Sequence, residues 1–410
     1  FFAGSETGMI KIPEEKIIEK GKLGPGQIIA IDLKKGKLFK DKAIKDLLAK
    51  DYKKYNKQII DLERKISDEN EKPNFKSDDL RKRQYLSGLS VEDLELILHP
   101  MAEEGKEASG SMGDDTPVAV LSSHFRPVSH YFRQNFSQVT NPPIDSLREN
   151  KVMSLKTRFG NLGNILDFDN LTEENIYVLD SPILTNSQLK KFKKFFSNKT
   201  KVIDCTFDIS LSLKERIEAI REEAETSVRE GSTCLILSDK DISNQKASIP
   251  SILTVGAVHS HLVKLGLRGY CSLNVECSDA LDTHSFAVLI GVGATTVNPY
   301  LAIDSIYQRH EKKLFGKSDF ESCVSKFKKS IDAGLLKIMS KMGISVISSY
   351  RGGCNFEAVG LSRAIVSDYF PGMSSRISGI GVIGIEKKIK ELNAKFNAKN
   401  VFTLPIGGLY

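Results

Sequence analysis

Two polar loops, at residues 111–116 and 138–143, carry the side chains of this chain that could best line a site. The first combines a glycine with two adjacent carboxylates that can accept hydrogen bonds from backbone N–H groups. The second ends in paired prolines, which lack N–H donors and leave carbonyl oxygens free. Neither loop contains a nucleophile with its base, a metal-ligand set or a phosphate cradle. The candidate residues are Ser111, Met112, Gly113, Asp114, Asp115, Thr116, Gln138, Thr140, Asn141, Pro142 and Pro143.

A second glycine pattern, GIGVIG at residues 379–384, has the spacing of a dinucleotide-binding motif. That motif requires an apolar strand before the glycines and an acid about 20 residues after them. Residues 374–378 do not look like an apolar strand, and no suitable acid follows within a strand–helix–strand unit. We therefore do not expect a dinucleotide site here.

Two further groups have a functional and a structural interpretation. His259 and His261 have the spacing of two metal ligands on a strand, but their surroundings have helical spacing, which points the rings to different faces. We expect each ring to bond a carbonyl or a carboxylate. Residues 291–300, GVGATTVNPY, follow a predicted strand at Phe286–Ile290 and could present N–H groups to a ligand. A turn of small residues that permits close packing is the preferred alternative.

Nucleophilic and metal chemistry have little support in the sequence. The cysteines form no CxxC pair and no zinc or iron–sulfur spacing, and no GxSxG motif occurs. We expect reduced and mostly buried thiols. The six cysteines are Cys205, Cys234, Cys271, Cys277, Cys323 and Cys354.

The elements before residue 174 are predicted from local patterns. Residues 1–33 read as two strands joined by a turn at Gly24–Gly26. Apolar residues spaced by three and four predict one amphipathic helix over 42–66, followed by a polar linker over 67–82 and a helix that Ser90 caps. Tyr131, Phe132 and Phe136 recur at helical spacing, which predicts a helix that holds the second loop.

Residues 174–300 alternate between apolar strands and amphipathic helices. The runs IYVLD, KVIDCTF and CLILSD, which end at Asp180, near Phe207 and at Asp239, are each interpreted as an apolar run that closes on an acid, and helices are predicted over 213–230 and 249–265. This alternation predicts an α/β fold whose sheet is mostly parallel and resembles an incomplete βα barrel. A β-hairpin segment and a helical linker precede it. Further helices are predicted over 334–342, 364–370 and 386–396.

The composition is that of an ordinary globular protein, with 40% hydrophobic and 27% charged residues. The formal net charge of +7 comes from lysines spread along the chain, without the basic and aromatic block typical of a nucleic-acid interface. No apolar run approaches the roughly 20 residues that span a bilayer, and the first residues lack a secretory signal. We expect a cytoplasmic protein that binds neither nucleic acid nor membrane.

Three long stretches carry a family resemblance. SMGDDTP at 111–117, FRQNFSQVTNPPIDSLRE at 132–149 and VMSLKTRFGNLGNIL at 152–166 resemble the central region of the large subunit of the glutamate synthases. The resemblance implies four parts: residues 1–35 as the tail of a glutamine amidotransferase domain, 36–100 as a helical connector, 101–397 as the central domain and 398–410 as the start of an FMN-binding domain.

The same resemblance implies what this chain would contribute to the enzyme. The family makes two glutamates from glutamine, 2-oxoglutarate and a reductant, with FMN and a 3Fe-4S cluster held outside this region. We therefore expect no catalytic, cofactor or metal residue here and no activity of the chain alone. Fused amidotransferase and FMN domains, and a small electron-donating subunit or ferredoxin, are the implied partners. The two loops would line the ammonia passage; a purely structural spacer and an independent α/β ligand-binding enzyme are the alternatives.

Overall fold

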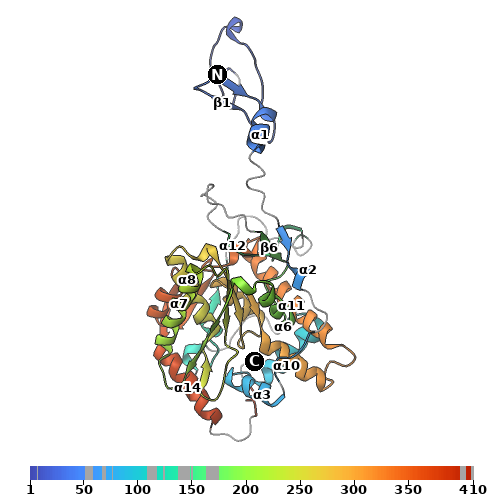
Figure 1. Ribbon diagram of the computed structural model, residues 1–410, viewed down its shortest axis with the longest axis vertical. Helices are drawn as coiled ribbons and strands as arrows, with labels where there is room; N and C mark the ends of the chain where they lie inside the picture. Colours follow the sequence, from blue (N-terminus) through green and yellow to red (C-terminus); the bar gives the residue numbers. More distant parts are fainter. Residues whose placement is uncertain are drawn as a thin grey trace. The chain divides into compact units, whose positions relative to one another are not determined.

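A computed structural model gives the fold of this chain. It describes residues 1–6, 8–50, 59–66, 71–75, 77–108, 118–122, 125–136, 148, 151–162, 175–397 and 403–407. The chain divides into two units, residues 1–57 and 58–410 (Figure 1).

The first unit is a short hairpin followed by a helix. Strands β1 (Ala30–Asp32) and β2 (Lys37–Phe39) pair antiparallel, and α1 (Asp41–Ala49) follows. The Asp32 carboxylate stabilises the turn by accepting hydrogen bonds from the backbone N–H groups of Lys34 and Lys35, at 3.0 and 3.1 Å. The predicted strand before the glycine turn is wrong, because that region holds only the 3₁₀ turn η1 (Glu14–Lys16). None of the described residues in 1–50 is buried.

The single helix predicted over residues 42–66 is wrong. Helix α1 ends at Ala49, and β3 (Ile59–Asp61) pairs in parallel with β6 (Ile176–Leu179), far downstream in the sequence. The short helix α2 (Glu63–Ile66) then places Leu62 and Ile66 in a buried cluster. Strand pairing and burial thus determine the conformation of these residues, although their apolar spacing by itself is compatible with a helix.

The second unit is built on a four-stranded parallel sheet in the order β12-β11-β9-β7. Every residue of β9, β11 and β12 is buried, as expected for parallel strands that helices cover. The described strands form separate sheets and no closed barrel, and the predicted α/β class with a mostly parallel main sheet is confirmed. These strands are β7 (Thr200–Asp204), β9 (Cys234–Ser238), β11 (Ser272–Glu276) and β12 (Thr296–Asn298).

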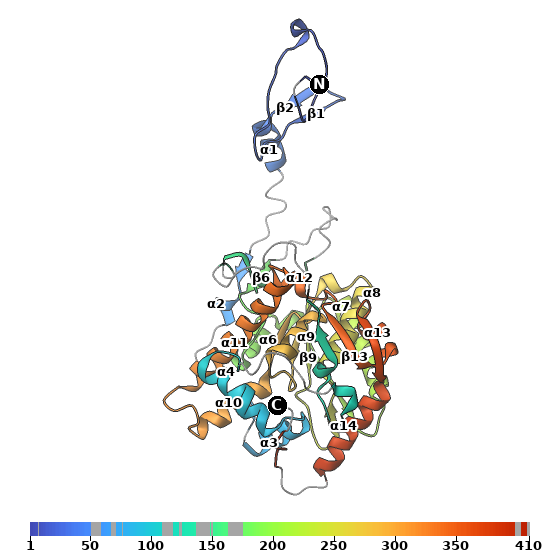
Figure 2. The same cartoon turned by 180° about the vertical axis from the view of Figure 1, so that it is seen from behind.

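Helices flank this sheet on both sides. Figures 1 and 2 show α7 and α8 on one side of the strands and α6, α10 and α11 on the other. The helices predicted over 213–230 and 249–265 are confirmed as α7 and α8, the one predicted over 334–342 is the second half of the longer α11, and α6 and α10 were not predicted. The bounds are α6 (Asn186–Phe195), α7 (Leu213–Arg229), α8 (Ser251–Lys264), α10 (Tyr300–Glu311) and α11 (Phe320–Met342).

The strand predicted at Phe286–Ile290 is instead part of helix α9 (Thr283–Gly291). Asp282 caps this helix, because its carboxylate accepts a hydrogen bond from the Ser285 N–H at 2.9 Å. An apolar run of this length fits a buried strand and a buried helix equally well. The cap residue before the run was the local signal that favoured the helix.

Three small sheets complete the strands, in the orders β3-β6-β5, β14-β13-β4 and β10-β8. The helix predicted around Tyr131 is wrong: a 3₁₀ turn, η5 (Val128–Tyr131), leads into β4, which pairs antiparallel with β13. Phe132 then packs edge-on against Phe356 and Phe370. The bounds are β4 (Phe132–Gln134), β5 (Thr157–Phe159), β8 (Thr206–Asp208), β10 (Lys246–Ser248), β13 (Phe356–Leu361) and β14 (Ser374–Ile380).

The remaining helices frame these sheets. The linker predicted over 67–82 is wrong from Ser77 onward, where α3 begins. The helix after Ser90 is confirmed, with Ser90 and Asp93 bonding each other's N–H groups at 3.1 and 2.8 Å. The bounds are α3 (Ser77–Leu86), the π-helical turn η3 (Asp93–Leu98), α4 (His99–Glu104), η4 (Ala119–Leu121), η6 (Ser197–Lys199), η7 (Arg268–Tyr270), α12 (Ile347–Tyr350), α13 (Arg363–Tyr369) and α14 (Val382–Asn397).

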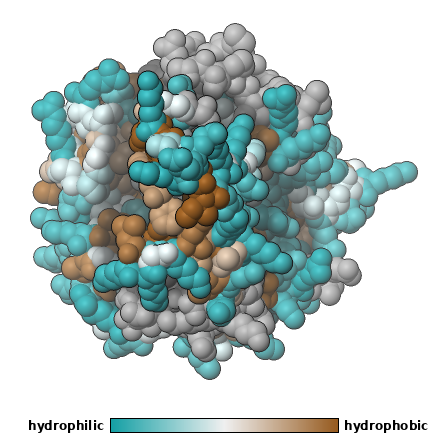
Figure 3. Space-filling model, turned by 90° about the horizontal axis from the view of Figure 1, so that it is seen from above, coloured by the Kyte–Doolittle hydropathy of each residue, from teal (hydrophilic) through white to brown (hydrophobic). Residues whose placement is uncertain are grey.

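The surface is mainly hydrophilic. Figure 3 shows polar and charged side chains over most of one face, with apolar residues between them. Five of the cysteines are buried and unpaired, as predicted, and Cys354 is exposed. Among the described residues, no helix combines the length and the hydropathy that a membrane span requires.

Candidate functional site

The two predicted loops lie outside the described residues, including Ser111, Met112, Gly113, Asp114, Asp115 and Thr116 of the first and Gln138, Thr140, Asn141, Pro142 and Pro143 of the second. Their described flanks meet at one strand. After the first loop, Val120 packs against Gly360 of β13. Before the second loop, β4 pairs with β13, and the Asn135 N–H donates to the Asn355 carbonyl at 2.8 Å. The described residues that follow the first loop and those that precede the second therefore contact the β14-β13-β4 sheet.

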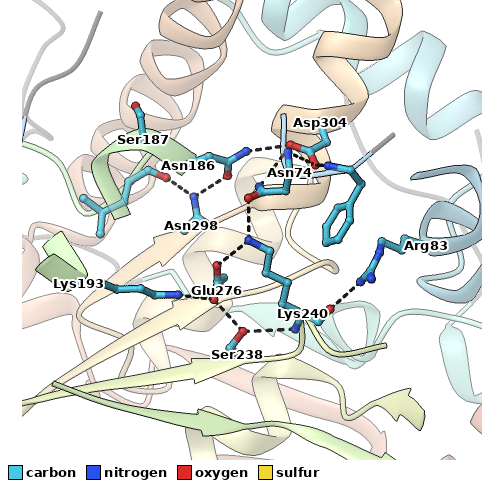
Figure 4. A network of polar contacts seen from close by, with 12 residues as sticks. Asn74, Arg83, Asn186, Ser187, Lys193, Ser238, Lys240, Glu276, Asn298 and Asp304 are labelled. Carbon is cyan, nitrogen blue, oxygen red and sulfur yellow. Dashed lines mark hydrogen bonds and ion pairs between the residues drawn. The ribbon is translucent and has the colours of Figure 1, made fainter. Parts of the chain in front are cut away.

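The residues that the structure does bring together lie at the carboxyl ends of the parallel strands. Strands β9, β11 and β12 end at Ser238, Glu276 and Asn298, which are paired in register. In α/β folds this edge of the sheet is where ligands usually bind. Figure 4 shows the polar network that fills it.

Glu276 is the anionic centre of this network. Its side chain is 4% exposed and accepts from Lys193 Nζ at 2.8 Å and from Ser238 Oγ at 2.8 Å, with Lys240 Nζ at 3.4 Å. Burial opposes ionisation of the carboxyl, but the two ammonium groups outweigh it and lower the pKa of Glu276. Glu276 is therefore an ionised, paired carboxylate.

Asp304 of α10 ties a distant segment to the same edge. Its buried carboxylate accepts from the N–H groups of Asn74 and Phe75, at 2.9 and 3.1 Å, and from Asn186 Nδ2 at 2.9 Å. Burial raises the pKa of Asp304 to about 7. The Asn74 side chain in turn accepts from Lys240 Nζ at 2.7 Å. The network thus closes residues 74 and 75 over the strand ends.

A second buried acid, Asp239, lies directly after β9. It accepts from Ser248 Oγ at 2.8 Å and from Ser278 Oγ at 2.6 Å, and burial together with the charge of Asp279 raises its pKa to about 6. The adjoining cavity, which Ser248, Ser278 and Asp279 help to line, has a volume of about 40 Å³. Ligand pockets are roughly 300–1,000 Å³. This cavity has room for water molecules but not for a flavin.

The network has few groups that could do chemistry. The thiols of Cys205 and Cys277 lie nearby, but burial raises the pKa of both well above the usual range, so they remain protonated. No group of three potential metal ligands occurs among the described residues. The network therefore acts as a polar closure of the sheet edge. Sequence analysis missed it, although the strands that end beside acids pointed to this edge.

The two histidines of α8 point in different directions, as predicted. His261 Nε2 lies 2.9 Å from Glu225 Oε2, which confirms the expected carboxylate partner. His259 is different: its Nδ1 accepts from Arg268 Nε at 3.1 Å, so its partner is a guanidinium. The expectation of a carbonyl or carboxylate partner for His259 is therefore wrong.

The small residues at 291–300 pack closely against the core. A side chain at Gly291 would overlap Phe356, and one at Gly293 would overlap His259. The residues that follow form β12 and begin α10. This geometry agrees with the close-packing interpretation.

The glycine motif at 379–384 spans the end of strand β14 and the start of helix α14, and this strand is not apolar, as expected. β14 is polar and largely exposed on its outer face, which hid it from the apolar pattern. A Cβ at Gly379 would overlap the Gly360 carbonyl on β13, and one at Gly384 would meet Ile380. These glycines therefore allow the backbone and the side chains of this chain to approach each other.

We predict that Gly379→Ala lowers the free energy of unfolding by about 1–3 kcal/mol, because the new methyl group overlaps backbone atoms that cannot rotate away. Gly381→Ala is the matched control: its Cβ would meet only Ser362, at 3.7 Å, an ordinary contact. Urea denaturation measures both. Equal losses for the two variants would contradict the packing role of Gly379.

Comparisons with known proteins identify two family matches. The family model of the glutamate synthase central domain matches residues 82–362, and that of the class II glutamine amidotransferases matches residues 1–57. The chain is 54% identical to the glutamate synthase [NADPH] large chain of Azospirillum brasilense, over 99% of this chain and 27% of that protein. It is 39% identical to the corresponding chain of Bacillus subtilis (strain 168), over 92% of this chain and 25% of that protein.

A ferredoxin-dependent relative is also similar. The ferredoxin-dependent glutamate synthase 2 of Synechocystis sp. is 37% identical over 94% of this chain and 26% of that protein. The chain thus spans about a quarter of the length of these relatives. The flavin-binding domain of baker's yeast flavocytochrome b2 aligns with 72% of this chain and 96% of its own, at 12% identity and a TM-score of 0.37, too low to show a common fold.

Proposed function

Because this chain belongs to the glutamate synthase family through its central domain, we propose that it is a part of a glutamate synthase large chain. The enzyme would convert glutamine, 2-oxoglutarate and a reductant into two glutamates. The observation that carries this proposal is the order of the two family matches along one chain, amidotransferase over 1–57 and central domain over 82–362.

We further propose the four parts expected from the resemblance: residues 1–35, 36–100, 101–397 and 398–410. The amidotransferase match supports the assignment of the first part. Exposed apolar side chains support it as well, because Phe1, Met9, Ile18 and Leu33 are each more than half exposed. Apolar surface of this kind is expected where a segment completes its fold against another part of the protein.

The central domain would connect the amidotransferase and FMN domains and line the ammonia passage with residues 111–116 and 138–143. Ammonia reacts as the neutral amine, so a passage has to exclude bulk water. The contacts of Val120 and of β4 with β13 support this proposal, because one sheet would then hold one end of each loop.

The test is the coupling of the two half-reactions in the full-length enzyme. We predict that Thr140→Val or Asn141→Ala makes glutamine hydrolysis exceed 2-oxoglutarate amination, so that the ratio rises above the coupled value of one. Asn198→Ala, at an exposed position of η6 far along the chain, is the control and should stay coupled. One-to-one coupling in both loop variants would remove these residues from the passage.

A structural spacer remains the second candidate, and the closed carboxyl edge favours it. In α/β folds, ligands usually bind at the carboxyl edge of the sheet. In the described part of this chain, Glu276, Asp304 and their hydrogen-bond partners lie at that edge. The cavity beside Ser248, Ser278 and Asp279, of about 40 Å³, is much smaller than the usual ligand pocket. The described cysteines and acids do not form a cluster site either.

We therefore place the FMN and the 3Fe-4S cluster of the proposed enzyme in other parts of the protein. The electron donor would likewise bind elsewhere, as a small subunit or as ferredoxin. Detectable flavin binding, or any turnover by the chain alone, would instead favour the independent ligand-binding enzyme.

A further inference from the structure

Two arginines lie side by side at the amino end of the parallel sheet, opposite to the network of Figure 4. Arg268 belongs to η7, before β11, and Arg351 follows α12 directly. They donate to consecutive carbonyls in the turn before β12: Arg268 Nη2 to Gly293 O at 2.9 Å and Arg351 Nε to Ala294 O at 3.0 Å. Consecutive carbonyls hold the two guanidinium groups close together.

Arg268 has only neutral partners, and they satisfy all three of its nitrogens. Its Nη1 donates to Cys271 O at 2.6 Å, and its Nε donates to His259 Nδ1 at 3.1 Å. No carboxylate among the described residues pairs with it. Each nitrogen of Arg268 is thus already bonded to a neutral group, and its positive charge lies near Arg351.

Arg351 differs, because its side chain makes a single hydrogen bond within the described residues, from Nε to Ala294 O. Its Nη2 is buried and has no hydrogen-bond partner there. Burial and the charge of Arg268 lower the pKa of Arg351 to about 9. A buried donor without an acceptor is costly, and guanidinium groups normally bind a carboxylate or phosphate through two parallel bonds.

His259 adds a third donor. Because its Nδ1 accepts from Arg268, the neutral ring carries its hydrogen on Nε2. Burial and the two arginines lower the pKa of His259 to about 3, so the ring stays neutral at physiological pH. The ring packs between Gly293 and Gly352, where a side chain on either glycine would crowd it. Its Nε2 faces Gly352, the residue that follows Arg351.

We propose that Arg351, with His259 Nε2–H beside it and Arg268 behind it, binds a small oxyanion of the phosphate or carboxylate class. The anion would fill the empty side of the Arg351 fork and balance two positive charges that share no acid among the described residues. Arg268, His259 and Arg351 are each partly exposed as whole residues, whereas Arg351 Nη2 itself is buried. The fork geometry favours two oxygens on one atom, which both anion classes provide.

The test is ion-specific thermal stabilisation of the chain at neutral pH. Sodium phosphate and sodium glutarate are titrated separately against sodium chloride of equal ionic strength. We expect one or both to raise Tm, by about 2 °C at roughly ten times the dissociation constant and then with the logarithm of the concentration. The response to phosphate or to glutarate identifies the class of anion. Arg351→Gln should abolish the rise, and Arg229→Gln, at an exposed position of α7, should keep it.

Arg351→Lys covers the case in which the glutamine variant does not fold. It keeps the charge and loses the fork, so calorimetric titration should show about tenfold weaker binding, the loss of one charge-assisted hydrogen bond. An unchanged Tm rise or affinity in these variants would overturn the proposal. A wild-type chain that neither ion stabilises would also overturn the proposal. If Arg351→Gln is then destabilised as well, a carboxylate of the protein already binds the Arg351 guanidinium.

Discussion

Asp304→Ala should lower the free energy of unfolding by about 2–4 kcal/mol, the largest effect we expect from a single substitution at the closed edge of the sheet. The carboxylate is 0% exposed and accepts from two backbone N–H groups and from Asn186 Nδ2. Alanine would leave these donors without their acceptor. It would also remove the hydrogen bonds that tie residues 74 and 75 to α10, leaving the ring contact between Phe75 and Tyr300.

Urea denaturation at a constant pH of about 4, where the contribution of Asp304 is nearly complete, measures this loss. Asp304→Asn keeps one acceptor oxygen and should lose less than the alanine variant. Asp241→Ala is the matched control, because Asp241 is exposed and pairs only with Lys246 at the surface; its loss should stay within about 1 kcal/mol. A loss below about 1 kcal/mol for Asp304→Ala would mean that water replaces the carboxylate and that the network does not hold the edge.

The second large effect is on pH dependence. Burial raises the pKa of Asp304 from 3.8 to about 7. Between these values the native state keeps the proton and the unfolded state has lost it, so the native state binds more protons and stability falls as pH rises. The contribution is fully present below the unfolded pKa and is lost by about pH 7. A shift of this size corresponds to roughly 4 kcal/mol.

The measurement is the difference in unfolding free energy between the wild-type chain and Asp304→Asn, at about pH 4, 5.5 and 7.5. Other acids, such as Glu276 with its lowered pKa, titrate in both proteins and cancel in the difference. We expect the difference to shrink steadily with increasing pH. A constant difference would show that the three hydrogen-bond donors keep Asp304 ionised and offset the effect of burial.

Local sequence patterns were sufficient to predict most of the strands and flanking helices of the central sheet. The strands Thr200–Asp204 and Cys234–Ser238 and the helix Leu213–Arg229 lie where their periodicity predicts them. A fully buried parallel strand needs a continuous apolar run, and a helix beside it needs one apolar stripe. Both requirements are met by neighbouring residues, so the sequence alone contains the signal.

The errors fall where a distant partner decides the conformation. Ile59–Asp61 has helical spacing but pairs with Ile176–Leu179, and Phe132–Gln134 pairs with Phe356–Leu361. Ser374–Ile380 is a strand although it lacks an apolar face pattern, because β13 supplies its hydrogen bonds. These partner strands lie far away in the sequence, so the conformational preferences of neighbouring residues could not predict the pairing.

The sites divide in the same way. Sequence alone determined the family resemblance, the α/β class and the two polar loops, because each depends on contiguous residues. Only the tertiary structure decided that Glu276, Lys193 and Asn74 meet at one sheet edge, and that Arg268 and Arg351 meet at the other. A buried charge is stable only beside its partners, and here those partners come from segments that approach one another only after the sheet has formed.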